Sequence, residues 1–179
     1  QGAHEAITAP GYTKIAPSAD LEWEFTPEVE QAIRSYLGPR RSELTKAVWR
    51  MGLYEKLVRR ILREEGVPED LVYLPIIESG YSPFAVSPAG AVGPWQFIKT
   101  TARRYGLKID RWIDERRDIE KSTRAACRYL KDLKETYGSW QLALAAYNCG
   151  EGRVNRALSK VSGDDFSYSD LPLPYETQR

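Results

Sequence analysis

The chain has 179 residues, which is long enough for one domain with a hydrophobic core, and 42% of its residues are hydrophobic while 28% are charged. This balance excludes a wholly disordered chain. The 26 basic residues are offset by 25 acidic ones, so no general positive field favours nucleic acid. Basic pairs such as Arg59-Arg60 and Arg116-Arg117 indicate a solvated helix face.

Neither a membrane span nor a metal site is indicated by the sequence. No apolar run approaches the roughly 20 residues that cross a bilayer, so any membrane anchor is expected only in segments outside this chain. Two cysteines and one histidine are too few for a Cys/His zinc centre. We therefore predict no metal, no cofactor and no nucleic-acid partner.

The first quarter of the chain is predicted as a lead-in followed by helices. Residues 1–25 are expected to be flexible, because prolines and a glycine interrupt them and no helical period is sustained. The Thr-Pro pair at 26–27 is typical of a helix N-terminus, and Gly38 ends that helix. Apolar residues recur at helical intervals over 42–65, where Gly52 is a candidate break.

The middle of the chain changes from a helical pattern to a loop rich in glycine and proline. A short apolar helix over 71–77 leads directly into Glu78, and a loop rich in glycine and proline runs from Gly80 to Pro94. A loop of this length inside a domain is usually functional or disordered, and its aromatic and small apolar residues favour function. The aromatic residues around it are predicted mainly as core, with one or two in a cleft: Tyr81, Phe84, Trp95, Phe97 and Trp112.

The second half of the chain has the clearest helical period. Residues spaced by three or four positions predict one buried stripe on a helix that Gly138 ends: Ile119, Thr123, Ala126, Leu130, Leu133 and Tyr137. Residues 140–147 are apolar nearly all round and predict a core helix, and a shorter helix runs to about Lys160. Because no strand alternation is present, we predict an all-α single domain over 26–179 with few or no strands.

Glu78 is the residue most suited to chemistry. Its carboxyl group stands at the end of an apolar helix where the loop begins. Loss of hydration raises the pKa of a carboxyl group, which then stays protonated near neutral pH. A general acid for a glycosidic oxygen needs this property. On placement alone, the structural alternative is a helix-terminal glutamate paired with an arginine.

Two blocks of the chain carry recognisable motifs. The segment IIESGYSPFAVSPAGAVGPWQFIKTTARRYGL contains Glu-Ser, then Ala-x-Ser-x-x-Gly-Ala-x-Gly, then a Gln before a Thr-Ala helix, and WQLALAAYNCGEGRV contains Ala-Tyr-Asn-x-Gly. In this order the blocks resemble the soluble lytic transglycosylase family. The segments DERRDIEKSTRAACRYLKDL and LPLPYET extend the likeness, over about residues 65–179, to its membrane-bound murein transglycosylase D branch.

The resemblance implies a lysozyme-like helical domain with a catalytic groove that cleaves peptidoglycan glycan strands. It also implies a location in the periplasm or cell envelope of a bacterium, with outer-membrane anchoring of the full-length protein. Glu78 would be the catalytic acid and then the base, and the Tyr147 hydroxyl would reach its carboxyl group. The residues implied to line the cleft and contact substrate are Ser79, Gln96, Tyr147, Asn148 and Glu176.

Each of these positions also has a structural interpretation. Ser79 suits a helix end, Tyr147 a core aromatic and Asn148 a helix C-terminus, and the loop glycines suit tight turns. Cys149 departs from the small residue that the family usually has there, and cysteine fits that volume without placing activity in doubt.

The implied reaction cuts the β-1,4 bond between N-acetylmuramic acid and N-acetylglucosamine without water. Glu78 protonates the glycosidic oxygen and, once ionised, removes the proton of the C6 hydroxyl, which closes a 1,6-anhydro ring. Glycosidases usually need two carboxylates, and the remaining candidates are Asp114, Glu115, Asp118 and Glu176. The alternatives are a hydrolase resembling goose-type lysozyme, a non-catalytic glycan-binding module and a purely structural helical domain.

The two cysteines are placed symmetrically about a glycine. Cys127 and Cys149 each lie eleven residues from Gly138. If the two helices form an antiparallel hairpin at that glycine, both cysteines lie at the same level, about 16 Å from the turn. They are then expected to be neighbours, and an exported protein would permit a disulfide between them.

Overall fold

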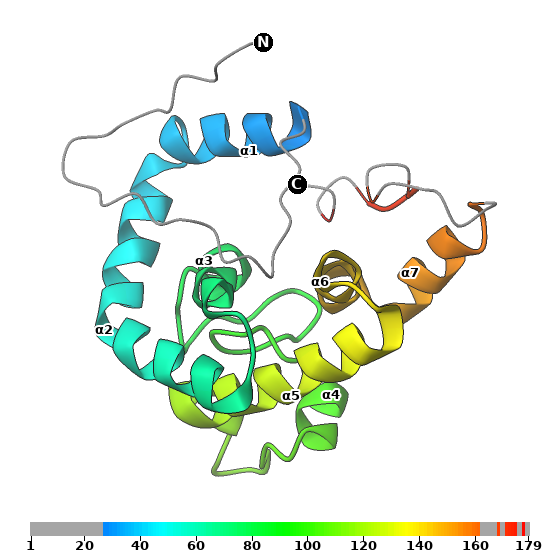
Figure 1. Ribbon diagram of the computed structural model, residues 1–179. Helices are drawn as coiled ribbons and strands as arrows, with labels where there is room; N and C mark the ends of the chain where they lie inside the picture. Colours follow the sequence, from blue (N-terminus) through cyan, green and yellow to red (C-terminus); the bar gives the residue numbers. More distant parts are fainter. Residues whose placement is uncertain (1–26, 162–167, 169–170, 175–176, 178–179) are drawn as a thin grey trace.

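The computed structural model describes residues 27–161, 168, 171–174 and 177 (Figure 1). Its elements in chain order are α1 (Pro27–Leu37), α2 (Arg41–Glu65), the 3-10 helix η1 (Glu69–Tyr73), α3 (Leu74–Ser79), α4 (Lys99–Arg104), the 3-10 helix η2 (Glu115–Arg117), α5 (Ile119–Tyr137), α6 (Trp140–Cys149) and α7 (Glu151–Leu158). Among the described residues, β-pairing is limited to isolated bridges such as Val86–Val92 and Val92–Phe97. The predicted all-α fold is therefore confirmed.

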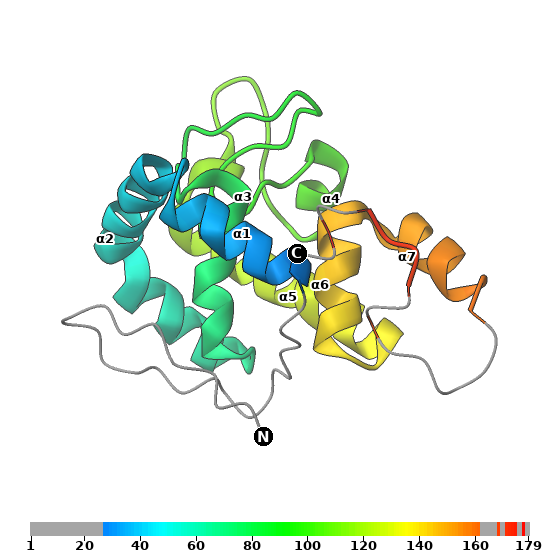
Figure 2. The same cartoon turned by 90° about the horizontal axis from the view of Figure 1, so that it is seen from above.

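The short helix α3 lies in the middle of the molecule. Figures 1 and 2 both show it between α2 on one side and α6 on the other. The long helix α5 packs against both α2 and α6, and α2 also contacts η1 and α3. The residues that carry Glu78 are therefore supported by helices from distant parts of the chain.

Two groups of buried side chains form the core. The first joins α2, η1, the loop after α3 and α5, and contains Val58, Ile61, Leu62, Trp95 and Leu130. The second joins the end of α5 to α6, α7 and the C-terminal segment, and contains Leu133, Ala146, Val154, Leu171 and Leu173. Tyr129, Trp140 and Tyr147 pack against both groups, so the two cores are continuous.

Helix α5 follows the predicted buried stripe. Four of its members, Thr123, Ala126, Leu130 and Leu133, are buried. The Asp118 side chain accepts a hydrogen bond from the Lys121 amide at the N-terminus, and Gly138 ends the helix in the left-handed region. The helices predicted over 140–147 and onward to about Lys160 are also present, as α6 and α7.

Two local predictions in the N-terminal half are wrong. Gly52 does not break α2, because an exposed glycine in a helix of this length costs only about 1 kcal/mol and nothing crowds it. The helix expected over 71–77 is divided between η1 and α3, and α3 continues through Glu78. The Thr26 N-cap lies outside the described residues, and the division into a 1–25 lead-in and a 26–179 domain stays a prediction.

The disulfide that the expected proximity of Cys127 and Cys149 would permit is not formed, since both are free thiols. Cys127 belongs to the first core group, whereas Cys149 packs against the second. Burial raises the pKa of the Cys127 thiol to about 12. Equal height on two helices does not fix the directions in which two side chains point, and here they enter different parts of the core.

The described residues contain neither a membrane-spanning helix nor a metal cluster. Within them, no helix is long and apolar enough to cross a membrane. The same part of the chain holds no group of three or more His, Cys, Asp or Glu side chains arranged to bind a metal ion.

Candidate active site

Glu78 stands in the last turn of α3, the six-residue helix at the centre of the fold. Gly80 ends this helix with φ 59°, in the left-handed region that glycine adopts at little cost. Its amide donates to the Ile76 carbonyl at 3.0 Å, and the Tyr81 amide donates to the Pro75 carbonyl at 3.0 Å. This closed C-terminus fixes the backbone next to the carboxyl group.

Two further contacts hold the same end of α3. The Ser79 Oγ lies 2.8 Å from the Pro94 carbonyl and 3.2 Å from the Pro75 carbonyl, so the hydroxyl donates between them and joins the helix to the loop. Arg50 of α2 donates from Nη1 to the Gly80 carbonyl at 3.1 Å. The Ser79 hydroxyl proton is therefore used at the helix end, as the structural interpretation expects. The residue also lines a cavity beside Glu78.

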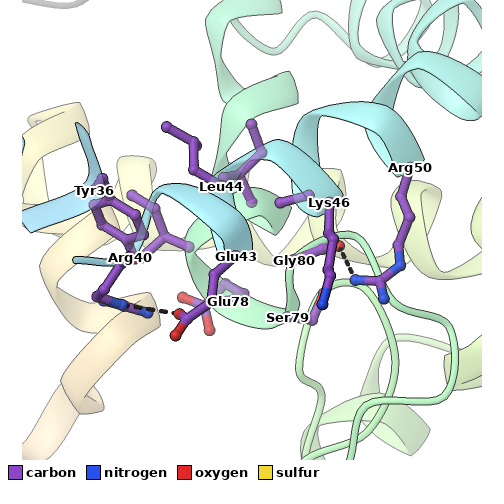
Figure 3. Close-up of a pocket in the computed structure, with 12 residues that line it drawn as sticks. Tyr36, Arg40, Glu43, Leu44, Lys46, Arg50, Glu78, Ser79 and Gly80 are labelled. Carbon is purple, nitrogen blue, oxygen red and sulfur yellow. Dashed lines mark hydrogen bonds and ion pairs between the residues drawn. The ribbon is translucent and has the colours of Figure 1, made fainter. Parts of the chain in front are cut away.

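This cavity has a volume of about 350 Å³. Residues of α1, α2 and α3 and of the turn between α1 and α2 line it (Figure 3). Its walls include the basic residues Arg40, Lys46 and Arg50 and the acidic residues Glu43 and Glu78. The cavity beside Glu78 is thus built mainly by α2 and α3.

The Glu78 carboxyl group is only partly exposed. Desolvation raises its pKa from the ordinary 4.5 to about 7, and a hydrogen bond with the Asn148 side chain opposes part of that rise. Both the direction and the main cause agree with the sequence-based prediction. A carboxyl group with this pKa is present in both protonated and ionised forms at neutral pH.

The Tyr147 hydroxyl has a different partner from the one expected. It donates to the Trp95 carbonyl at 2.6 Å instead of to Glu78. Burial, followed by the charge of Glu78, raises the pKa of Tyr147. With its proton engaged on Trp95, the hydroxyl can only accept a hydrogen bond from a protonated Glu78.

Asn148 connects Glu78 to the C-terminal segment. Its Oδ1 accepts a hydrogen bond from the Thr177 hydroxyl at 2.8 Å, and its side chain also hydrogen-bonds Glu78. The Tyr168 hydroxyl in turn donates to the Thr177 carbonyl at 2.9 Å. Of the implied substrate-contacting residues, Asn148 is thus the one bonded directly to the acid, and Glu176 lies outside the described residues.

Gln96 belongs to the loop and does not line the cavity formed by the described residues. Its backbone has φ 48°, which is uncommon for a residue other than glycine. Its side-chain amide donates to the Gly93 carbonyl at 2.8 Å. A non-glycine residue kept in this conformation is often found at functional sites, and the implied sugar contact of Gln96 stays a prediction.

The loop between α3 and α4 is held by a buried arginine. Arg116 donates from Nη1 to the Phe97 carbonyl at 3.1 Å and the Gly90 carbonyl at 3.2 Å. Its Nε and Nη2 pair with the two Asp114 oxygens at 2.8 and 2.7 Å. The Gly93 backbone packs directly against the Arg116 backbone, because a Cβ added at Gly93 would lie 1.9 Å from the Arg116 carbonyl oxygen. These contacts hold the loop in one conformation.

Three of the four other carboxylates proposed as partners of Glu78 have structural roles. Asp114 pairs with Arg116, which holds the pKa of Asp114 below its usual range. Asp118 caps α5. Glu115 accepts from the Lys121 ammonium at 2.5 Å and from the Lys108 amide at 2.7 Å, and the pKa of Glu115 is lowered accordingly. The fourth, Glu176, is outside the described residues.

The aromatic residues near the loop divide clearly. Tyr81, Trp95 and Phe97 are buried, as predicted for most of them. Trp95 donates from its indole nitrogen to Thr123 Oγ1 at 2.9 Å, which fixes the ring in the core. Phe84 and Trp112 are exposed to 78% and 85% and lie outside the cavity lining.

Sequence reasoning missed several residues around the acid. Arg40, Lys46 and Arg50 carry no motif, and α2 was predicted only as an amphipathic helix. Thr177 directly follows Glu176 in the C-terminal motif, so that motif was the signal that could have indicated it. Arg116 was assigned to a solvated face, but it is buried.

The fold and the site together define a lysozyme-like helical protein whose groove holds one carboxyl group that titrates near neutrality. A family model, the transglycosylase SLT domain, matches residues 56–169, so the chain belongs to that family. It is 39% identical over 93% of its length to membrane-bound lytic murein transglycosylase D of Escherichia coli K12, covering 40% of that protein. This agrees with the branch that the motifs indicated.

Two other relatives match a smaller part of the chain. Membrane-bound lytic murein transglycosylase F of Alcanivorax borkumensis is 33% identical over 82% of the chain, which covers 32% of that relative. Peptidoglycan transglycosylase gp16 of Escherichia phage T7 is 36% identical over 64% of the chain, which covers 9% of it. The chain therefore spans less than half the length of each of these relatives.

Proposed function

We propose that this chain is a peptidoglycan lytic transglycosylase with Glu78 as its general acid and then its general base. The observation that carries the proposal is a partly buried carboxyl group with a pKa of about 7 in the wall of a groove. Membership of the transglycosylase SLT domain family and the names of the relatives support the same activity and substrate.

A single acid with this pKa suits both halves of the reaction. In its protonated form Glu78 donates to the oxygen between N-acetylmuramic acid and N-acetylglucosamine as that bond breaks. The resulting carboxylate then removes the proton of the C6 hydroxyl, whose oxygen attacks C1 and closes the 1,6-anhydro ring. The proton returns to Glu78, no water is consumed, and no cofactor takes part.

Other groups of the site support this cycle. The Asn148 side chain hydrogen-bonds Glu78 and opposes the rise in its pKa, and so favours the ionised form that acts as base. Tyr147 can accept from the protonated form, which acts as acid. We assign sugar contacts to Ser79, Gln96, Asn148 and Glu176 on the family likeness.

The hydrolase alternative needs a second carboxylate to activate water. Asp114, Glu115 and Asp118 are each committed to an ion pair or a helix cap, which favours the transglycosylase. The relatives are named as murein-acting and membrane-bound, so we assign the protein to the bacterial cell envelope. We also expect outer-membrane anchoring of the full-length protein.

The test is digestion of purified peptidoglycan followed by mass spectrometry of the soluble products. We expect muropeptides one water lighter than those released by lysozyme. Glu78→Gln keeps the shape of the side chain and removes the acid, so the rate should fall at least about a hundredfold. Glu135→Gln is the matched control, since Glu135 is exposed on α5, and it should retain wild-type activity.

Three results would contradict parts of this proposal. Products with free reducing ends would identify a hydrolase. Release of nothing by either wild type or Glu78→Gln, with equal binding of both to glycan, would identify a binding module. Full activity of Glu78→Gln would exclude Glu78 as the acid.

A further inference from the structure

Basic side chains are concentrated around the groove beside Glu78, although basic and acidic residues nearly balance over the whole chain. The whole sequence has a formal net charge of only +1. The lining of this cavity, however, contains Arg40, Lys46 and Arg50, and among the described residues Glu43 is its only acidic side chain besides Glu78. Because Glu78 is largely protonated below its pKa of about 7, the lining has a net positive charge in mildly acidic to neutral solution.

The three cations differ in how far the protein uses them. Arg40 is paired with Glu43 at 2.9 Å and lies over the Tyr36 ring. Arg50 donates one hydrogen bond to the Gly80 carbonyl. Because a guanidinium has five N–H donors, other donors of Arg50 remain for a ligand. The Lys46 ammonium has no partner within the part of the chain that the structure describes. Lys46 and part of Arg50 are therefore available to a ligand.

The two residues also point in the same direction. Lys46 and Arg50 are four positions apart on α2 and share one face of that helix. Figure 3 shows both side chains extending from α2 toward the Ser79–Gly80 end of α3. A ligand group that enters here lies next to the turn that carries Glu78.

The chemistry of the substrate indicates what that group is. The sugar rings of the glycan are uncharged, so a groove that binds only the rings has no use for cations. N-acetylmuramic acid differs by its lactyl ether at C3, which carries either a free carboxylate or a stem peptide with carboxylates of its own. This is the sugar whose C1 bond is cut, so its substituent lies close to Glu78.

We propose that Lys46 and Arg50 form a subsite for the carboxylates borne by the C3 substituent of N-acetylmuramic acid, an inference that rests on the proposed function of the groove. The subsite orients the sugar whose bond Glu78 protonates and selects murein over uncharged glycans. Arg50 has a second consequence, because it holds the Gly80 carbonyl and so ties the bound anion to the turn beside the acid.

The test measures binding by co-sedimentation in a Glu78→Gln background, so it does not depend on turnover. The probes are peptide-bearing sacculi, the same sacculi stripped to free lactyl carboxylates by an amidase, and chitin as an uncharged polymer. Lys46→Glu is the test variant, because Lys46 is exposed and its ammonium has no partner among the described residues. Lys56→Glu, exposed on the same helix but outside this cavity, is the matched control.

We expect Lys46→Glu to weaken binding to sacculi about tenfold, since an exposed ion pair contributes up to about fivefold and reversal of charge adds repulsion. Binding to chitin and the Lys56→Glu control should stay within about twofold of the parent. Binding of the Glu78→Gln parent to sacculi should also weaken between low and physiological salt. A loss confined to peptide-bearing sacculi assigns the ligand to stem-peptide carboxylates, and a loss confined to stripped sacculi assigns it to the lactyl carboxylate.

Two results would overturn the subsite. One is unchanged binding of Lys46→Glu to both kinds of sacculi. The other is an equal loss on chitin or in Lys56→Glu, which would indicate a general charge effect. Failure of the proposed activity is a separate result, because it would appear as missing anhydro products in the digestion while the binding pattern could still be measured.

Discussion

The Thr177 hydroxyl donates to Oδ1 of Asn148 at 2.8 Å. This bond identifies the oxygen end of the amide, so the NH₂ group of Asn148 is the end that reaches the Glu78 carboxyl. The segment before Thr177 is anchored by the buried Leu171 and Leu173. The C-terminal segment thus contributes to the protonation state of an acid about a hundred residues earlier in the chain.

Thr177→Val should therefore change how activity depends on pH. The variant keeps the shape of the side chain but loses the donor, so Asn148 is held less firmly. Because the Asn148 bond lowers the pKa of Glu78, its weakening should raise that pKa. Activity that requires protonated Glu78 falls as the pH rises through about 7 in wild type, and this fall should move to higher pH in the variant. Because about half of Glu78 is already protonated at pH 7 in wild type, the rate at neutral pH should rise by no more than about twofold.

Thr177→Ser is the control for that experiment. Serine keeps the hydroxyl, so the wild-type pH profile of kcat/KM should return. A uniform loss of rate in Thr177→Val with the same pH profile would mean that Thr177 supports the fold only.

The raised pKa of Glu78 should also appear in the pH dependence of stability. The folded protein keeps its proton to about pH 7, whereas the unfolded chain releases it near 4.5. The folded state therefore binds more protons between these values, and its stability falls as the pH rises through this window. Glu78→Gln removes that penalty, so it should be up to about 3 kcal/mol more stable than wild type at pH 8 and nearly equal at pH 4. Urea unfolding at the two pH values measures the difference, and equal destabilisation at both would contradict it.

Two glycines of the loop provide a matched pair. Both have positive φ, 77° at Gly90 and 84° at Gly93, but a Cβ at Gly90 meets nothing within 4 Å while one at Gly93 would collide with the Arg116 carbonyl. Gly90→Ala should cost about 1 kcal/mol for the backbone alone. Gly93→Ala should cost about 3 kcal/mol or more and reduce activity, because the loop must move. Similar unfolding free energies for the two variants would show that the loop is not held by this contact.

Asp114→Asn separates structural from catalytic carboxylates. Arg116 is only 9% exposed, and loss of its charged partner should reduce stability by about 3 kcal/mol. Since the pKa of Asp114 is lowered in the folded protein, its contribution is present above about pH 4 and is lost as the pH falls through the folded value. The products should remain anhydro muropeptides. A switch in product type, with unchanged stability, would instead assign water activation or exclusion to Asp114.

The sequence predicted the elements whose signal is local. The buried stripe predicted on α5 was correct because residues three or four positions apart lie on the same face of a helix. The two ends of α5 were also predictable, since Asp118 and Gly138 are local capping signals. Gly52 was misjudged because a glycine inside a long amphipathic helix costs less than the packing of its neighbours contributes.

The partners within the site were less predictable. Glu78 could be identified from its motif and its apolar approach, and its raised pKa followed from burial alone. The bond from Tyr147 to Trp95, and the link from Asn148 to Thr177, depend on how segments distant in sequence meet, and no periodicity encodes that. The same reason explains the cysteines, since height along a helix is periodic whereas the side chain's surroundings depend on tertiary packing.

The brevity of α3 has a consequence for the living cell. Six residues are too few to form a stable helix alone, so Glu78 is positioned only when Arg50, Pro94 and Asn148 have all arrived from other parts of the chain. A chain that is still folding, or that has been damaged, has no aligned acid. In the lytic transglycosylase that we propose, the acid is therefore in place only once the fold is complete.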